Sequence, residues 1–223
     1  MTKAKNSEEK DFNTYVSSSS FTTHFGLPEE WCHGNLPHRN RDNLIQSVTF
    51  RLSDSLPQEV LSEMEEELKT LPETRREVEK RMRHEKWMDK GLGCCALANP
   101  EMAQVVFDAL KYYDGDKYNL LAWSIMPNHV HVLIEAKSNL NKIIQAWKSY
   151  TGKWAFANNE IHELGIDKGA KHFWMSEHWD RFIRNRIHFE NTLKYILDNP
   201  KNANLHASNI AYRFTGSVVI PER

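Results

Sequence analysis

The sequence lacks any long hydrophobic run, and no stretch approaches the roughly 18 to 20 apolar residues that a membrane-spanning helix needs. Residues 1–20 are polar and contain no hydrophobic segment, so they do not have the pattern of a secretory signal. The 223 residues include only three cysteines, which is too few for a disulfide framework. These absences predict a cytoplasmic protein with free thiols and no membrane partner.

The charge of the chain is nearly balanced, with 29 Lys and Arg against 30 Asp and Glu. Its distribution is uneven, because residues 137–223 hold 13 basic against 8 acidic residues. A nucleic-acid partner carries negative phosphates and would therefore meet the C-terminal part. Unequal halves of this size are common, so charge alone does not decide in favour of such a partner.

Composition divides the chain into three parts. Residues 1–30 carry a serine run and few apolar residues, which predicts a flexible N-terminal arm. Residues 31–205 hold the periodic segments, and their length is typical of one folded domain. Residues 206–223 are weakly patterned and are expected to form a C-terminal tail.

Hydrophobic periodicity predicts a mixture of strands and helices. Alternation predicts a strand at 44–52 and two more at 118–125 and 129–135, which only three residues separate, so they should pair as an antiparallel hairpin. A short strand or turn is expected around 172–179. Helical spacing predicts four helical regions: 58–90 (broken or kinked near Pro72), about 100–113, about 140–157, and about 187–199, ended by Pro200.

The order of these segments is that of a ferredoxin-like split βαβ layer. We therefore expect an α+β fold, in which an antiparallel sheet has helices on one face. Such a sheet leaves its other face free to carry a site. The last predicted helix would follow the sheet as a C-terminal helix.

The segment most informative about chemistry surrounds His129 and His131. Side chains alternate along a strand, so these two histidines should share one face, while Val130 and Val132 point into the core. Residues two apart on a strand are about 6 to 7 Å apart at the backbone, so both imidazoles could reach one cation. The alternative is a pair of exposed histidines on an edge strand, and a bare His-x-His motif does not distinguish the two.

The sequence around this pair resembles a known family. Met-Pro-Asn-His-Val-His-Val-Leu-Ile at 126–134, with Tyr-Ile-x-x-Asn-Pro at 195–200, looks like the HUH single-tyrosine transposases, in particular the REP-associated tyrosine transposases. Each short motif is weak, but the set follows the family order over roughly residues 35–205. The further matches are Asn35–His38, Val48–Pro57, Trp147–Gly152, Phe173-Trp174 and Trp179–Arg184.

The resemblance implies that His129 and His131 bind a divalent ion, that Tyr195 is the nucleophile and that Asn199 is the third protein ligand. Tyr195 and Asn199 are i, i+4 and would lie one above the other on a helix. We expect Mg²⁺ in the cell, with Mn²⁺ as a substitute. Tyr150 is a rival nucleophile, but its spacing from two tryptophans on the same predicted helix is that of a packing residue.

The implied activity is nicking and joining of single-stranded DNA through a 5′-phosphotyrosine intermediate. The implied partner is hairpin DNA from palindromic repeats, associated with the nucleoid, and the protein would act as a monomer or a homodimer. Basic residues are predicted to contact phosphates and one tryptophan to stack on a base. These DNA-binding candidates are Arg181, Arg184, Lys148, Lys153 and Trp174.

Two other classes of function compete with this interpretation. A non-catalytic ferredoxin-like module that binds nucleic acid would place exposed aromatic residues where this chain has His129 and His131. A metal-dependent hydrolase of small phosphoesters would use the same histidines but leave Tyr195 without a role.

Overall fold

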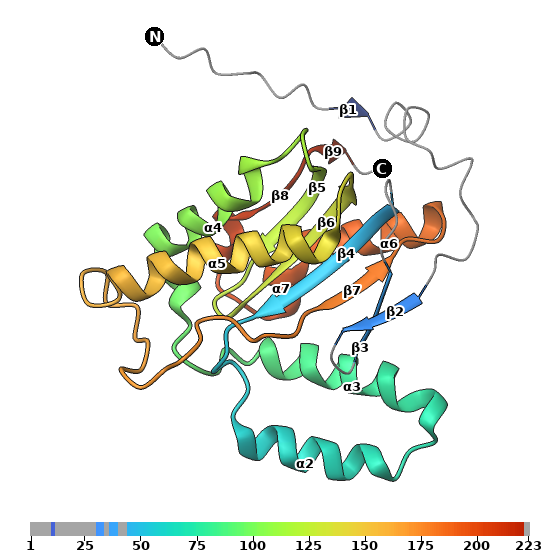
Figure 1. Cartoon of the computed structure of the whole chain (residues 1–223), viewed down its shortest axis with the longest axis horizontal. Helices are drawn as coiled ribbons and strands as arrows, with labels where there is room; N and C mark the ends of the chain where they lie inside the picture. Colours follow the sequence, from blue (N-terminus) through green and yellow to red (C-terminus); the bar gives the residue numbers. More distant parts are fainter. Residues whose placement is uncertain (1–9, 12–29, 34–35, 40–43, 221–223) are drawn as a thin grey trace.

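A five-stranded sheet forms the centre of the structure, a computed structural model that describes residues 10–11, 30–33, 36–39 and 44–220. The strand order is β7-β4-β6-β5-β8, and every neighbouring pair is antiparallel (Figure 1). The strands are β4 (Leu44–Arg51), β5 (Tyr118–Ile125), β6 (His129–Ala136), β7 (Trp179–Phe182) and β8 (Thr215–Ser217).

Helices connect these strands, and two small strand pairs lie outside the sheet. The helices are α2 (Gln58–Lys69), α3 (Glu73–Met88), the 3-10 helix η1 (Ala96–Ala98), α4 (Pro100–Tyr112), α5 (Leu140–Asn158), α6 (Arg186–Leu197), α7 (Asn199–Asn202) and α8 (Ile210–Arg213). The small pairs are β2 (Glu30–His33) with β3 (Leu36–Arg39), and β1 (Lys10–Asp11) with β9 (Val219–Ile220).

The sheet has the split βαβ topology that the segment order predicts. β4 and β5 are both antiparallel to β6, which lies between them, so β4 and β5 run parallel to each other. In the same way β6 and β7 run parallel on either side of β4. Two interleaved βαβ units therefore make up four of the five strands, and the predicted α+β class is confirmed.

Both faces of the sheet are covered, but by different helices. Helices α4 and α5 pack on one face through Val48, Val130 and Val132, in what we call the α5-side core. Helix α6 packs on the opposite face against Ile45 and Leu133, in a smaller α6-side core. Figure 1 shows α5 in front of the sheet and α6 behind it. The face that the sequence leaves free for a site is therefore partly covered by the C-terminal helix.

Asparagine side chains cap the N-termini of three helices that pack against the sheet. The Asn99 side chain accepts from the backbone N–H groups of two residues in the first turn of α4, and Pro100 follows it. Asn139 and Asn185 cap α5 and α6 in the same way. Each cap satisfies backbone donors that a helix start leaves unpaired, which fixes where α5 and α6 enter the fold.

Two predicted boundaries differ from the structure. The short strand expected around 172–179 is β7 and begins only at Trp179, because its place is set by pairing with β4. Helix α6 ends at Leu197, and Pro200 lies inside the following short helix α7. Pro200 can sit there because the first residues of a helix need no intrahelical N–H partner.

The segment after residue 205 contributes to the sheet through α8 and β8. Gly216 in β8 pairs with Trp123 of β5, and a Cβ added to Gly216 would lie only 2.9 Å from the Trp123 ring. The absence of a side chain therefore allows this close approach. The predicted arm of residues 1–30 lies almost wholly outside the described residues, and the boundary at 205 stays a prediction.

The predictions of free thiols and of no membrane-spanning helix can be compared with the described part of the chain. None of its helices is long and apolar enough to cross a membrane. Cys94 and Cys95 are free, and burial, followed by the neighbouring carboxylate of Asp54, raises the pKa of Cys94 to about 12. Such a thiol stays protonated and unreactive at neutral pH.

Candidate functional site

His129 and His131 lie side by side on the central strand β6. Their Nε2 atoms are 3.1 Å apart, and the angle between their ring planes is 88°. Each side chain is only 1% exposed. Because β6 lies between β4 and β5, the alternative of two exposed histidines on an edge strand is wrong. The two imidazoles share one face of the sheet, as the alternation predicts.

Hydrogen bonds at both Nδ1 atoms determine how the rings present Nε2. The side-chain N–H of Asn128 donates to the carbonyl of Leu92 at 3.0 Å, so its Oδ1 faces Nδ1 of His129, 2.8 Å away. An amide oxygen only accepts, so Nδ1 of His129 carries the proton and Nε2 keeps its lone pair. The Thr49 hydroxyl lies 2.9 Å from Nδ1 of His131 and can accept in the same way. Two Nε2 lone pairs can therefore point into one space.

Burial keeps both imidazoles neutral. It lowers the pKa of His131 to about 3. Burial, followed by repulsion from His131, also holds the pKa of His129 well below its ordinary value. The neutral imidazole is the form that binds a metal ion, so the pair is ready for a cation at neutral pH.

Tyr195 approaches the histidine pair from α6. Its ring lies edge-on to that of His131, with 5.4 Å between the ring centroids. Phe189, Leu193 and Ile196 hold the helix against the sheet in the α6-side core, and all three are buried. The phenol is therefore fixed in a half-buried position beside the imidazoles.

Asn199 lies beside the phenol, as the i, i+4 spacing predicts. Its side chain is 1% exposed and shares a hydrogen bond with Tyr195. Its Oδ1 has no hydrogen-bond partner among the described residues. Burial nevertheless raises the pKa of Tyr195 above its ordinary value, and the carboxylates of Glu85 and Asp89 raise it further.

A stripe of charged side chains from α3 faces the same site, and no sequence pattern predicts this position. Arg81, Glu85 and Asp89 are spaced four residues apart and therefore share one side of the helix. Glu85 accepts a hydrogen bond from the phenol of Tyr195 and pairs with Arg81 at 3.5 Å. Oδ1 of Asp89 lies 4.0 Å from Nε2 of His129. Burial, followed by repulsion from Glu85, raises the pKa of Asp89 to about 6.

The available donors fit a small divalent cation. The separation of the two Nε2 atoms is 3.1 Å. Adjacent ligands of an octahedral ion with bonds of about 2.1 Å are about 3.0 Å apart, which is close to this value. Oδ1 of Asn199 is a buried oxygen donor without a partner. In the described part of the chain no three His, Cys, Asp or Glu side chains converge as a metal cluster, so a set of three protein ligands would need this amide.

Arg181 lines a cavity that opens beside Tyr195. The cavity has a volume of about 390 Å³, and His131 and Arg81 also line it. Burial, followed by repulsion from Arg81 and Arg184, lowers the pKa of Arg181. The side chains of Arg181 and Arg184 are exposed. Arg81 and Arg181 line this opening together with the carboxylates of Glu85 and Asp180, and the two arginines could contact a ligand with negative charge.

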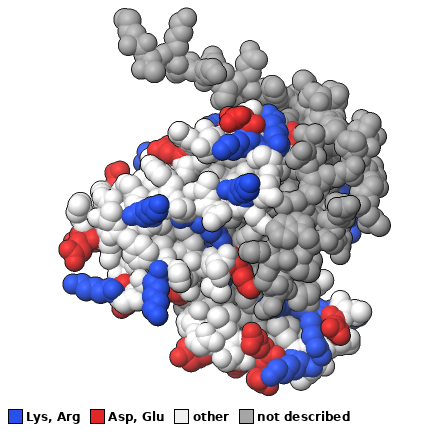
Figure 2. All heavy atoms as spheres, in the orientation of Figure 1, with Lys and Arg blue, Asp and Glu red and all other residues white. Residues whose placement is uncertain are grey.

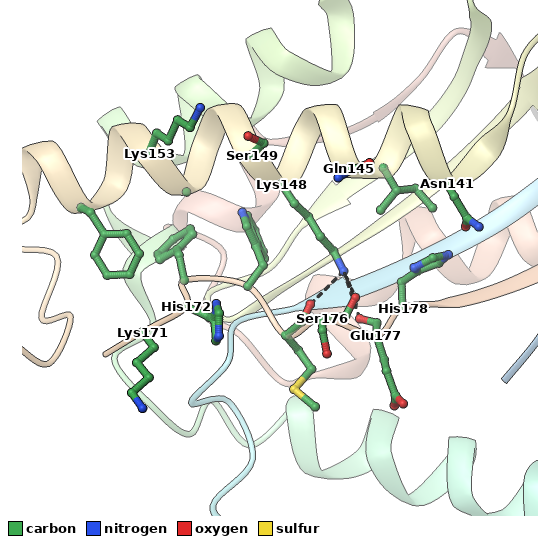
Figure 3. A pocket seen from close by; sticks show the side chains of 16 residues that line it. Asn141, Gln145, Lys148, Ser149, Lys153, Lys171, His172, Ser176, Glu177 and His178 are labelled. Carbon is green, nitrogen blue, oxygen red and sulfur yellow. Dashed lines mark hydrogen bonds between the residues drawn. The ribbon is translucent and has the colours of Figure 1, made fainter. Parts of the chain in front are cut away.

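The other DNA-binding candidates lie in a groove on the α5 side of the sheet. This groove runs between α5 and the segment 171–178, and its volume is about 660 Å³ (Figure 3). Lys153 is exposed there. Lys148 extends across the groove toward the segment, and its Nζ donates to the carbonyl oxygens of residues 175–177 at 2.8, 3.1 and 3.0 Å. The three protons of Lys148 are thus used within the chain.

The predicted DNA roles of Lys148 and Trp174 do not fit these positions. Burial, followed by repulsion from Arg51, lowers the pKa of Lys148 to about 8, and the side chain anchors a loop. The Trp174 side chain is 5% exposed, and its ring packs edge-on against Phe50 and Phe173 in the core. A stacking platform needs an open ring face, so we correct the assignment of Trp174 to a packing residue.

Tyr150, the rival nucleophile, lies away from the histidine pair. Its side chain is 59% exposed on α5, next to Tyr112 of α4. Helix α5 packs on the face of the sheet opposite to His129 and His131, so the sheet separates Tyr150 from them. The helical spacing predicts a packing residue at Tyr150, but the structure leaves most of its side chain exposed.

Among the described residues, basic side chains do not form one continuous patch on the α5 face. Figure 2 shows Lys and Arg scattered over this face, with Asp and Glu among them. The C-terminal excess of positive charge is thus not concentrated here. The arginines beside Tyr195 belong to the opposite side of the sheet.

Comparisons with known proteins point to one family. Residues 99–199 match the family described as "Transposase IS200 like", which confirms the expected resemblance over this segment. No curated protein matches the chain. A solved structure of a REP-associated tyrosine transposase bound to a REP hairpin is similar, with 14% identity, a TM-score of 0.44, and coverage of 76% of this chain and 74% of that one. At this TM-score the similarity carries no argument about function.

Proposed function

We propose that this chain, which has the sequence pattern of the IS200-like transposases over residues 99–199, cuts and rejoins single-stranded DNA. One observation carries the proposal. The phenol of Tyr195 stands edge-on to His131, 5.4 Å away between ring centroids, and the lone pair of His129 points toward the same space. A nucleophile and a cation-binding pair on one face are the two parts that phosphoryl transfer to a tyrosine requires.

In the proposed reaction the Tyr195 oxygen attacks the scissile phosphorus and displaces the 3′ oxygen. The phenol loses its proton, and Glu85, which interacts with the Tyr195 hydroxyl, is the proposed base. The departing 3′ oxygen takes up a proton from water. The products are a 5′-phosphotyrosine on the protein and a free 3′-OH. Attack by another 3′-OH reverses the step and joins two strands without ATP.

His129, His131 and Asn199 would hold the divalent cation, with Mg²⁺ in the cell and Mn²⁺ as a substitute. When bound, the cation polarises the scissile phosphate and offsets the negative charge of the transition state. The interaction of the Asn199 side chain with the phenol also orients the nucleophile. Thr49 and Asn128 hold the imidazoles in the tautomer that binds metal.

The proposed substrate is single-stranded at the cleavage point and carries a hairpin from palindromic repeats. A phosphate stacked inside a duplex could not reach a half-buried phenol on the face of a sheet. Arg181, which lines the cavity beside Tyr195, and the neighbouring Arg184 are the proposed phosphate contacts, and Lys153 is a more distant one. Association as a monomer or a homodimer stays a prediction.

A denaturing gel of the protein mixed with labelled hairpin DNA and Mn²⁺ tests the proposal. The wild type should give a covalent protein–DNA band, and Tyr195→Phe should give none while binding DNA as before. Tyr150→Phe is the matched control and should keep the band. DNA binding without any band would favour the non-catalytic module, and release of free phosphate would favour the small-phosphoester hydrolase.

A further inference from the structure

Helix α3 reaches the candidate site from a helical hairpin inserted between β4 and α4, and none of its residues belongs to the proposed ligand set. Asp89, the residue that ends α3, lies beside the histidine pair, with its Oδ1 4.0 Å from Nε2 of His129. Its side chain is 28% exposed. The carboxylate thus stands next to the space into which the imidazole lone pairs point.

Nothing in the helix itself explains a carboxylate at this position. The C-terminus of a helix carries partial negative charge, so an acidic side chain there is unfavourable. Glu85, one turn earlier, is paired with Arg81 at 3.5 Å. For Asp89, by contrast, no Lys or Arg of the described residues lies within ion-pairing distance, and its neighbour Glu85 repels it. Among the described residues, therefore, no Lys or Arg side chain offsets the negative charge of the Asp89 carboxylate.

The proposed ligands do not carry the charge that a divalent cation prefers. An imidazole must be neutral to bind a metal ion, and the third donor, Asn199, is a neutral amide with an unpartnered, buried Oδ1. Mg²⁺ favours oxygen ligands and usually binds through one or two carboxylates while it keeps several waters. Asp89 is the carboxylate nearest to this group that has no cationic partner.

We infer that Asp89 belongs to the cation site, where it faces the ion from the α3 side and contacts it through an ion-bound water. The inference rests on the proposed function, since it assumes that the histidine pair binds a cation. The carboxylate supplies the negative charge that the two imidazoles and the amide lack. An added oxygen donor also favours Mg²⁺ and Mn²⁺ over softer ions, which prefer thiolate and imidazole.

Titration of metal-free, full-length protein with Mn²⁺, followed by calorimetry and by the EPR signal of free Mn²⁺, tests the inference. Asp89→Asn should weaken Mn²⁺ binding by about ten-fold or more, which is the typical loss for an outer-shell partner. Asp108→Asn is the matched control, since it removes the same charge from an exposed position on α4. It should bind Mn²⁺ within two-fold of the wild type.

The thermal stability of the same variants separates a loss of binding from a loss of folding. Metal-free Asp89→Asn should melt at or above the wild-type temperature, because the substitution removes an unpaired carboxylate from the end of α3. Added Mn²⁺ should raise the melting temperature of the wild type more than that of the variant. Equal shifts in the two proteins would overturn the role of Asp89.

His131→Gln distinguishes failure of this inference from failure of the proposed function. If His131→Gln loses Mn²⁺ binding and Asp89→Asn binds like the wild type, only the role of Asp89 is wrong. If His131→Gln also binds Mn²⁺ like the wild type, the histidine pair is not the cation site and both proposals fail.

Discussion

Replacing Thr49 with valine tests whether the partners of the imidazoles control metal binding. The Thr49 hydroxyl lies 2.9 Å from Nδ1 of His131 on the neighbouring strand, and its side chain is 8% exposed. Valine has nearly the same shape, so the substitution removes the hydroxyl and leaves the packing between β4 and β6 in place.

The size of the effect follows from what the substitution leaves behind. A buried imidazole N–H without a partner costs about 1 to 3 kcal/mol of folding free energy. Without the hydroxyl, His131 can also place its proton on Nε2, where it would block the cation. Loss of such a partner typically lowers metal affinity by about 10 to 100-fold. This range corresponds to about 1.4 to 2.7 kcal/mol of binding free energy.

Mn²⁺ titration of Thr49→Val by calorimetry, together with urea denaturation of the metal-free protein, measures both effects. Thr151→Val is the matched control, because Thr151 is 1% exposed and also hydrogen-bonded, but to Trp147 and Trp174 on the other side of the sheet. The control should lose stability and keep its Mn²⁺ affinity. A Thr49→Val protein that binds Mn²⁺ within two-fold of the wild type would refute the reasoning.

Three further predictions concern other residues. Trp174→Phe should lower the free energy of unfolding by about 1 to 3 kcal/mol, because it removes a buried hydrogen bond and core volume, but should leave DNA affinity in a binding titration unchanged. Arg181→Ala should weaken DNA binding and reduce the slope of log K against log salt by about 0.7 to 0.9, the value for one phosphate contact; an unchanged slope would remove Arg181 from the interface. Without metal, stability should fall as the pH drops below 6.5 toward 3, because unfolded His131 binds a proton that the folded protein excludes until its pKa of about 3. In urea denaturation, His131 should lower the free energy of unfolding by up to about 1.4 kcal/mol for each pH unit. The fall should be smaller in His131→Gln. Asp89 has the opposite effect on stability in both the wild type and His131→Gln. Because folding raises the pKa of its carboxyl, this group makes the folded state more stable as the pH falls.

Local patterns were sufficient to predict the three long strands of the sheet and the face that carries the histidines. The alternation along β6 placed His129 and His131 on one face and the valines on the other, and the three-residue connection to β5 specified the hairpin. Alternation could not place β7 or β8, which have only four and three residues and whose position depends on pairing with β4 and β5. Their bounds come from tertiary contacts.

The sequence could not reveal that α3 reaches the candidate site. Arg81, Glu85 and Asp89 have the i, i+4 spacing of ordinary surface ion pairs, and the helix around them is highly charged, so the pattern is the same as that of a solvated helix face. Their role depends on how the α2–α3 hairpin packs against the sheet. The roles of Trp174 and Lys148 likewise depend on their burial in the fold. Residue type alone does not distinguish a packing tryptophan from one that stacks on a base.

The most direct measurement for the role of Tyr195 is peptide mapping of the protein–DNA adduct by mass spectrometry. Trypsin should release residues 195–201 and 149–153 as separate peptides, each with one tyrosine. If Tyr195 is the nucleophile, the nucleotide mass will be found on peptide 195–201 and will be absent from the Tyr195→Phe protein. An adduct on peptide 149–153, or one that persists in Tyr195→Phe, would contradict this assignment.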